Sequence, residues 1–457
     1  MANKFLEFFK EPPALEPIQD QEKVKSMYSH FRWRIFYSSF IAYIVYHLCR
    51  KNLAVALPAM GADLNLSNTE LGLLGASLYL FYGVGKFVNG ILADRSNVRT
   101  FLPTALILSA VCNLLFVLST VFIPTHSTHG AAVLLWTLAF FWGANGWFQS
   151  MGFPPVAKSL SYWFSNSERG TKWSLWSTSH QFGVFAAVML SGYAIEHFGW
   201  EAAFYLPSFI CIVTGLWLYD RLRDKPQTLG LPDIEKYNNE PVVEDKKSDD
   251  EDNRPYLQIF KENILCNPIM WMLAISYIFV YIVRFGTEDW LVKYLVEVKG
   301  DSLTLASSKL SSLALIGAFG AIGAGVISDK VYRGNRTPVN IIFLICLVIS
   351  LIAFATNTNS TLDFVYAAMI GVFTAGPQLL IGGICAVESS SKKVASASIG
   401  FTGVFGYLGA VLSSSGTGYM IDTFGWNGAI AFWVFSSAIC IVLCCAMWVI
   451  QSRKKLR

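Results

Sequence analysis

The sequence predicts an all-α membrane protein with twelve transmembrane helices in two pseudo-symmetric six-helix halves and both termini in the cytoplasm. Three observations favour this fold class. The chain of 457 residues is 54% hydrophobic and only 14% charged, whereas a soluble domain usually carries about 25% charged residues. Apolar segments long enough to cross a bilayer recur along the chain. Short motifs of the first half recur in the second half in the same order.

Apolar segments of about 20 residues are typical of membrane helices. The twelve expected spans are 34–57, 70–92, 101–123, 131–160, 174–196, 202–220, 269–296, 306–328, 338–356, 363–387, 396–420 and 428–450. They divide the chain into two halves with a linker between them and a cytoplasmic segment at each end. The expected parts are the N-terminal segment 1–33, the N-terminal half 34–220, the cytoplasmic linker 221–268, the C-terminal half 269–450 and the tail 451–457.

Basic residues occur in alternate connections between these spans. They lie before the first span, after the last, and in the second, fourth, eighth and tenth connections, whereas the first, third, fifth, ninth and eleventh connections contain none. Because connections rich in Lys and Arg stay in the cytoplasm, both termini and all even-numbered connections are expected there. The basic residues concerned are Lys4, Lys10, Lys23, Lys25, Arg32, Arg34, Arg95, Arg99, Arg169, Lys172, Lys330, Arg333, Arg336, Lys392, Lys393, Arg453, Lys454, Lys455 and Arg457.

The sixth connection, residues 220–261, is long and polar. Its acidic run at 244–253 has the sequence EDKKSDDEDN. Such a segment cannot bury enough apolar surface to fold, so we expect a mobile linker between the two halves. A regulatory binding role is the alternative, and the solvated linker is favoured.

Two short motifs indicate an internal duplication. GILADR at 90–95 matches GVISDK at 325–330, an offset of 235 residues, and GYAIEHFGW at 192–200 matches GYMIDTFGW at 418–426, an offset of 226. Both motifs recur in the same order at nearly one offset. Parallel repeats of this kind place a binding site between the halves near the bilayer midplane.

Arg50 lies well inside the apolar run 36–58 of the first expected span. A cation at this depth costs at least about 2.5 kcal/mol, so it normally faces a protein interior or an aqueous cavity. Tyr43, Tyr46 and Arg50 follow at helical spacing and share one helix face. This face is therefore a candidate binding surface.

The duplication relates Arg50 to Arg284 in the seventh expected span, at an offset of 234 residues. The two arginines can then meet across the central axis. The alternative is that each pairs with a carboxylate: the first span contains none, whereas Glu288 and Asp289 closely follow Arg284. We favour an external anion, because two buried guanidiniums lack enough carboxylates here. A guanidinium binds a phosphate or carboxylate through two parallel hydrogen bonds.

Other polar side chains are expected at similar depth. In the second span, Tyr79 and Tyr82 share a helix face with Lys86, and Tyr281 lies one turn before the arginine of the seventh span. These side chains could line the same cavity as the two arginines.

His180 in the fifth span is a further candidate, because the fifth helix of a duplicated fold would face that cavity. Its charge can change near neutral pH, although a plain interhelical hydrogen bond is the alternative. His47 is interpreted as packing. Gln149 and Trp147 of the fourth span are weaker candidates for lining the cavity.

Charged residues gather at the cytoplasmic ends of the second and eighth spans. Opposite charges there could form ion pairs that join the halves and break when the halves move apart. The alternative is that the positive charges only fix the topology, and the duplicated Asp and Gly favour the gating role. The residues are Gly90, Asp94, Arg95 and Arg99, and in the second half Gly325, Asp329, Lys330, Arg333 and Arg336.

Other classes of protein find little support in the sequence. The net charge of +4 is too small to indicate nucleic-acid binding, and the nine cysteines show neither metal-ligand spacing nor a disulfide framework. No nucleophile–base pair or metal cluster stands out. We therefore expect no enzyme, no metal site and no cofactor.

Several blocks between about residues 30 and 450 resemble a known family. The duplicated G-x-L-A-D-R pattern and the twelve spans with a central loop are similar to the major facilitator superfamily. More specifically, eight blocks resemble the organophosphate:phosphate antiporters, the bacterial glycerol-3-phosphate and hexose-phosphate transporters. These blocks are YHLCRKNLAVALP, YGVGKFVNGILAD, NGWFQSMGFPP, SERGTKWSLWSTSH, NPIMWMLAISYIFVYIVRFGTEDW, SDKVYRGNR, GPQLLIG and GFTGVFGYLG.

The resemblance implies exchange of a sugar phosphate for inorganic phosphate across the bacterial inner membrane. We expect a monomer in the lipid bilayer, with no nucleic-acid partner. By motif position, the resemblance implies that Arg50 and Arg284 bind phosphate and that Asp94 acts between the halves. The implied cavity residues are Lys86, His180, Tyr43, Tyr82 and Tyr281.

The chain departs from the family pattern at several positions. Ser177 and Gln181 stand where the family usually has Asn on either side of the fifth-span His, and Ala314 replaces a common Glu. Ile399 and Thr402 replace an Asp and a Lys of the hexose-phosphate members, so this block is closer to the glycerol-phosphate type. The whole sequence still favours hexose 6-phosphate, with glycerol 3-phosphate next.

Two rival functions fit the same fold class. A sugar-phosphate sensor that signals to a membrane partner would need a docking surface, and nothing in the sequence indicates one. A proton-coupled carboxylate or drug transporter would need a buried Asp or Glu as proton carrier. The first-half spans offer none deep in the membrane.

Overall fold

The structure is a computed structural model that describes residues 7–123, 127–240, 256–391 and 394–455. Within these residues the regular elements are helices, and the β-type pairing is one isolated antiparallel bridge between Lys10 and Ser96. The parts of the sequence used above that lie outside the described residues are the acidic run 244–253, Lys4, Lys392, Lys393 and Arg457.

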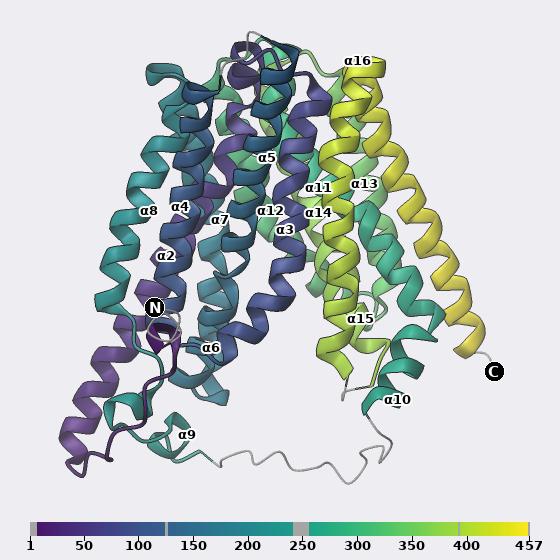
Figure 1. Ribbon diagram of the computed structural model, residues 1–457. Helices are drawn as coiled ribbons and strands as arrows, with labels where there is room; N and C mark the ends of the chain where they lie inside the picture. The colour runs from purple at the N-terminus through teal and green to yellow at the C-terminus, as the bar shows by residue number, and fades with distance from the viewer. Residues whose placement is uncertain (1–6, 124–126, 241–255, 392–393, 456–457) are drawn as a thin grey trace. The chain divides into compact units, whose positions relative to one another are not determined.

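Long helices account for most of the chain (Figure 1). The first part contains α2 (Gln21–Asp63), α3 (Asn68–Asp94), α4 (Val98–Phe122), α5 (Thr128–Ser150), α6 (Phe153–Trp163), α7 (Asn166–Phe198), α8 (Ala202–Arg221), the short 3₁₀ turn η1 (Pro226–Leu229) and α9 (Ile234–Tyr237). The second part contains α10 (Tyr256–Phe260), the π-helical turn η2 (Lys261–Leu265), α11 (Pro268–Glu297), α12 (Leu303–Lys330), α13 (Arg336–Thr356), α14 (Ser360–Leu379), the π-helical turn η3 (Leu380–Ile384), α15 (Cys385–Glu388) and α16 (Ala395–Lys455).

Ten helices of the described chain are long and apolar enough to cross a membrane. The expected span 174–196 lies in α7, which is not among the ten, and the expected spans 396–420 and 428–450 both lie in α16. The backbone of α16 leaves the helical conformation at Gly425 (φ 67°, ψ −171°), a region that favours glycine. The element is thus two helices that meet at the predicted eleventh connection. The all-helical class is confirmed, whereas the count of twelve and the orientation stay predictions.

Helix starts follow from side chains that satisfy the first backbone N–H groups. Asn97 Oδ1 accepts a hydrogen bond from Arg99 N at 2.9 Å at the start of α4, and Ser302 Oγ accepts one from Leu305 N at 3.3 Å at the start of α12. Proline stands at the first position of α11, where its missing N–H costs nothing.

Residue contacts divide the chain into two compact units. Unit 1 contains residues 1–52, 81–194 and 201–247, and unit 2 contains residues 53–80, 195–200 and 248–457. The helices α2 and α3 therefore contribute to both units. The predicted division into halves at 34–220 and 269–450 stays a prediction.

Part of the expected mobile linker is folded against unit 1. Leu231 and Ile234 are only 3% and 1% exposed, and the Tyr28 hydroxyl donates a hydrogen bond to the carbonyl of Pro232. The backbone N–H of Ile18 donates to the carbonyl of Gly230 at 2.9 Å. The expectation of mobility is wrong for residues 222–240, because a few apolar residues among the polar ones reach the core of unit 1.

Within unit 2, small residues let α3 and α16 approach closely. A Cβ atom on Gly72 would lie 2.5 Å from the carbonyl oxygen of Ser414, and one on Gly418 would collide with the carbonyl of Asn68. Side chains larger than glycine would therefore separate the two backbones. Small residues at such crossings are typical of helix packing in membranes.

Two carboxylates at repeat-related positions bind the starts of two repeat-related helices, both within unit 2. Asp422 accepts hydrogen bonds from the backbone N–H groups of Asn68 and Thr69, at 3.1 and 2.7 Å, where α3 begins. Glu196, the counterpart of Asp422 in the GYAIEHFGW motif, accepts one from the Thr304 hydroxyl where α12 begins. A carboxylate is stabilised at a helix N-terminus by the helix dipole and the unpaired N–H groups. The pair of contacts supports the duplication inferred from the sequence.

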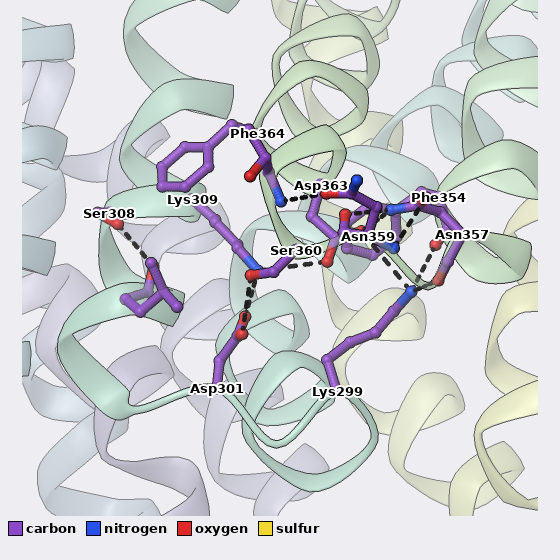
Figure 2. Close-up of polar contacts among 12 residues, drawn as sticks. Lys299, Asp301, Ser308, Lys309, Phe354, Asn357, Asn359, Ser360, Asp363 and Phe364 are labelled. Carbon is purple, nitrogen blue, oxygen red and sulfur yellow. Dashed lines mark hydrogen bonds and ion pairs between the residues drawn. The ribbon is translucent and has the colours of Figure 1, made fainter.

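A buried group of charges joins α12 to the α11–α12 connection and to the first turn of α14 (Figure 2). The Lys309 ammonium group is fully buried and lies 2.5 Å from Asp301 Oδ2, 3.2 Å from Asp363 Oδ2 and 2.8 Å from Ser360 Oγ. The Lys299 ammonium group lies 3.6 Å from Asp363 Oδ1. Two lysines and two aspartates thus balance each other. The sequence offered no signal for this group, because its members come from three separate segments.

Replacing Lys309 by Met should strongly destabilise the protein. The substitution keeps the length of the side chain but leaves Asp301 and Asp363 without their shared cation, and breaking a buried pair typically costs about 3–5 kcal/mol. Thermal unfolding of the purified protein in detergent, followed by size-exclusion chromatography, measures the effect. The exposed Lys261 provides the control, since Lys261→Met should change stability by less than about 0.5 kcal/mol. An unchanged melting temperature for Lys309→Met would contradict a stabilising role.

Candidate functional site

In unit 1, the Arg50 side chain lies against an aromatic ring. Arg50 comes from α2, and its guanidinium carbon is 4.4 Å from the ring centre of Tyr82 on α3. A cation over an aromatic face is stabilised by the ring quadrupole, by up to about 2 kcal/mol where water is excluded. The structure therefore brings together two of the predicted site residues from different helices.

His180 on α7 belongs to an aromatic group with residues of α2. Its ring centre lies 4.5 Å from that of His47 and 6.3 Å from that of Tyr43. The Tyr43 ring also packs on Trp176 at 4.7 Å. His47 is only 2% exposed, and its Nδ1 lies 2.8 Å from the Tyr43 carbonyl oxygen, so Nδ1 carries the hydrogen. Tyr43 and His180 thus lie near each other. His47 packs against both rings and against Gly183.

The predicted face of α3 that carries Tyr79, Tyr82 and Lys86 is divided between the two units. Tyr82 lies with Arg50 in unit 1, whereas the Tyr79 hydroxyl donates a hydrogen bond to Asp289 within unit 2. Lys86, one turn beyond Tyr82, is exposed. Asp289 is therefore engaged by a tyrosine of the first half.

In unit 2, Arg284 forms an ion pair with the carboxylate one turn further along α11. Arg284 Nε lies 3.0 Å from Glu288 Oε1, and both side chains are about 15% exposed (14% and 15%). The guanidinium also lies 4.9 Å from the Phe285 ring centre and 5.7 Å from that of Tyr281. The carboxylate pairing that the sequence left as an alternative is thus present for Arg284. Any anion bound there shares the arginine with Glu288.

The expectation that Gln149 lines a cavity is wrong. Gln149 is 4% exposed, and its Nε2 donates hydrogen bonds to the Tyr46 carbonyl at 2.9 Å and to Ser109 Oγ at 2.8 Å. Its polar group is engaged by neighbouring helices, which the sequence alone could not show. Trp147 is half-buried, and its carbonyl accepts a hydrogen bond from Asn89 Nδ2 at 3.2 Å.

The positions that depart from the family pattern lie in different surroundings. The Ser177 hydroxyl donates to the Trp173 carbonyl of its own helix at 2.9 Å. Thr402 is buried, and its hydroxyl donates to the Gly382 carbonyl at 3.2 Å, where η3 interrupts the regular helix. Ile399 is exposed. Of these three, Ile399 is the most exposed side chain.

The charged groups expected to act in gating lie at helix ends. Asp94 and Arg95 are exposed at the end of α3, and Lys330 is exposed at the end of α12. Asp329 forms an ion pair with Arg336, which also lies 3.0 Å from Glu388 Oε1. These contacts stay within unit 2, and the gating role stays a prediction. Among the described residues, no three His, Cys, Asp or Glu side chains gather to hold a metal ion.

A helical membrane fold with an internal duplication, and with one arginine against aromatic rings in each half, is typical of a membrane transport protein. A profile of the Major Facilitator Superfamily matches residues 39–414. The crystal structure of a D-xylose–proton symporter has the same fold, with a TM-score of 0.69 at 12% identity over 92% of this chain and 97% of that chain.

Curated relatives narrow the family further. A probable hexose phosphate transport protein of Chlamydia pneumoniae is 38% identical over 98% of this chain and 97% of its own length. The membrane sensor protein UhpC of Escherichia coli K12 is 35% identical, with 93% of each chain covered. A glycerol-3-phosphate transporter of Bacillus subtilis 168 is 34% identical over 97% of this chain and 98% of its own length. The chain belongs to the organophosphate:phosphate antiporter family of the major facilitator superfamily, and it is a multi-pass inner-membrane protein.

Replacing Glu288 by Gln tests whether Arg284 binds an anion or only pairs with Glu288. If Arg284 binds phosphate, Glu288→Gln should tighten phosphate binding about tenfold, because it removes a negative charge near the anion. Arg284→Met should abolish binding. Isothermal titration of the purified protein with inorganic phosphate measures both effects.

The double variant Arg284→Met/Glu288→Gln separates the two roles of the pair. If Arg284 only balanced Glu288, replacing both charges together would restore phosphate binding. Persistent loss in the double variant supports the anion-binding role.

Proposed function

We propose that the protein is a secondary active transporter that takes up a sugar phosphate in exchange for inorganic phosphate. Hexose 6-phosphate is the favoured substrate and glycerol 3-phosphate the next. The observation that carries the proposal is the occurrence of Arg50 and Arg284 at repeat-related positions in two apolar helices, each held against aromatic rings. The names of the hexose-phosphate and glycerol-3-phosphate relatives support the substrate class.

In this proposal Arg50 and Arg284 bind the same phosphate group. A phosphate dianion can accept two parallel hydrogen bonds from each of two guanidinium groups. Lys86, His180, Tyr43, Tyr82 and Tyr281 contact the remainder of the substrate. The role of Glu288 is to offset part of the positive charge near Arg284 when no anion is bound, which lowers the cost of the empty site.

Exchange follows from the free-energy cost of burying the two guanidinium groups when no anion is bound. Reorientation through an occluded state would remove water from two guanidiniums, and Glu288 supplies one carboxylate beside Arg284. Removing water from both cations without a bound anion is therefore unfavourable in a low-dielectric surrounding. A bound phosphate must therefore accompany each reorientation, outward as well as inward. Only tighter binding to the occluded state can drive closure.

A sensor is the second candidate, and its support is the 35% identity with the membrane sensor protein UhpC. Both functions need a site for the sugar phosphate, but only the transporter moves it across the membrane. A monomer suffices for the transporter, because each chain carries both arginines.

Counterflow in liposomes tests the transport proposal. Vesicles that contain the purified protein and internal phosphate should accumulate labelled glucose 6-phosphate faster than labelled glycerol 3-phosphate. Vesicles without internal phosphate should accumulate neither. Absence of uptake of both substrates, with retained binding, would leave the sensor as the better interpretation, and uptake driven by a proton gradient without phosphate would contradict exchange.

Replacing Arg50 by Lys should lower exchange at least about tenfold, since a point charge cannot make the paired hydrogen bonds, each worth about 1.5–3 kcal/mol. The conservative change keeps the charge. A loss of exchange would therefore show that exchange requires the paired hydrogen bonds of a guanidinium and not only a positive charge. Arg221→Lys is the control, because Arg221 lies at the end of α8 against Trp217. Normal exchange by Arg50→Lys would show that Arg50 does not bind the phosphate.

A further inference from the structure

A group of buried polar side chains surrounds the turn of α2 that carries Arg50. Its members come from three helices of unit 1 and are at most 4% exposed. We call them the amide cluster: Asn52 of α2, Ser109 and Asn113 of α4, and Asn145 and Gln149 of α5. Amides buried at this depth need partners, because lipid and apolar side chains offer no hydrogen bonds.

Three amide groups of the cluster bind the backbone of α2 directly. Asn145 Nδ2 and Asn113 Nδ2 donate hydrogen bonds to the Cys49 carbonyl at 2.8 and 3.2 Å. Gln149 Nε2 donates to the Tyr46 carbonyl at 2.9 Å. A carbonyl oxygen in a regular helix still has a second lone pair for such donors. Two successive turns of α2 are therefore held from outside the helix.

The members of the cluster also bind one another. Ser109 Oγ donates to Asn145 Oδ1 at 2.6 Å and accepts from Gln149 Nε2 at 2.8 Å. Asn52 Nδ2 donates to Asn113 Oδ1 at 2.9 Å and to the Ala203 carbonyl of α8 at 3.0 Å. The contacts make α2, α4, α5 and α8 one hydrogen-bonded assembly. Such a network favours one rotation of α2 over others, because any other rotation leaves amides unpaired.

The held carbonyls lie next to Arg50 in the chain. Cys49 precedes it directly, and the Tyr46 carbonyl is the one that accepts the Arg50 backbone N–H in a regular helix. At the outer radius of a helix, about 6 Å, a rotation of about 10° moves a side chain by about 1 Å. A binding group must be held within about 0.5 Å of its productive position. Apolar packing alone allows rotations of this size more easily than directional hydrogen bonds do.

We propose that Asn145 and Gln149 are positioning residues that set the rotation of α2 and thereby aim Arg50 at the phosphate. The inference rests on the proposed function, in which Arg50 binds that phosphate. It assigns the two arginines different means of orientation. Arg284 is oriented by the Glu288 carboxylate on its own helix, whereas Arg50 is oriented through the backbone that carries it.

The variants Asn145→Leu and Gln149→Met test the proposal, because they remove the donors and keep the side-chain size. Each should raise the KM for inorganic phosphate about tenfold in phosphate–phosphate exchange, with a smaller change in kcat. Asn89→Leu is the matched control. Asn89 is equally buried, and it donates to the Trp147 carbonyl and to Ser150 Oγ, at 3.2 and 2.7 Å, both of which belong to α5. It should leave the KM unchanged.

A double-variant comparison separates positioning from stability. If Gln149 acts through Arg50, then Gln149→Met should add less than about twofold to the phosphate Kd of Arg50→Lys, although it raises that of the native chain about tenfold. Effects that multiply independently would overturn the proposal, as would a KM change no larger than that of Asn89→Leu. Should Asn145→Leu fail to fold, Ser109→Ala removes the hydroxyl held between the two amides and is judged by the same criteria.

Failure of this inference differs from failure of the proposed function. A native chain that neither binds nor exchanges phosphate would remove both. A native chain that exchanges phosphate, with cluster variants that behave like the Asn89 control, would remove only the positioning role.

Discussion

The absence of water in the bilayer core constrains each polar side chain that a membrane-spanning helix carries there. A charge or amide placed there needs a partner from the protein or a ligand, because lipid offers none. Arg50 is the clearest case, since the apolar span 34–57 that carries it contains no carboxylate and its guanidinium lies on the ring of Tyr82. The amides around it bind the backbone of α2, whereas the side chain of Arg50 lies against the aromatic ring. Arg284 satisfies the same requirement differently, through Glu288 on its own helix.

Unit 2 contains further charged groups that are satisfied by contacts between segments. Lys309 and Asp363 are buried together and share partners with Asp301 and Lys299, so that the group carries no net charge. Asp422 and Glu196 bind helix starts, where N–H groups lack partners within the helix. These repeat-related contacts show that the duplication extends beyond the motifs to the hydrogen bonds they form.

Local patterns predicted most of the helices, and some of the candidate site residues lie together in the structure. Apolar length located the spans. Tyr43 and His180 were expected in the same cavity, and their ring centres lie 6.3 Å apart. Where the prediction failed, a contact between distant segments was responsible. Gln149 is engaged by α2 and α4, the lysine at 309 meets carboxylates from two other segments, and residues 222–240 fold because Leu231 and Ile234 reach a core that the linker sequence does not show.

The sequence by itself determined the class of protein, the internal duplication and the two arginines, because hydropathy, repeats and rare charges in apolar runs can be seen one segment at a time. The tertiary structure decided which partner each polar group takes. It paired Arg284 with a carboxylate and placed Arg50 against a tyrosine, and it turned the amides of α4 and α5 toward the backbone of α2. The physical reason is that a hydrogen bond depends on distance and direction between atoms of different helices, and helix packing alone sets these.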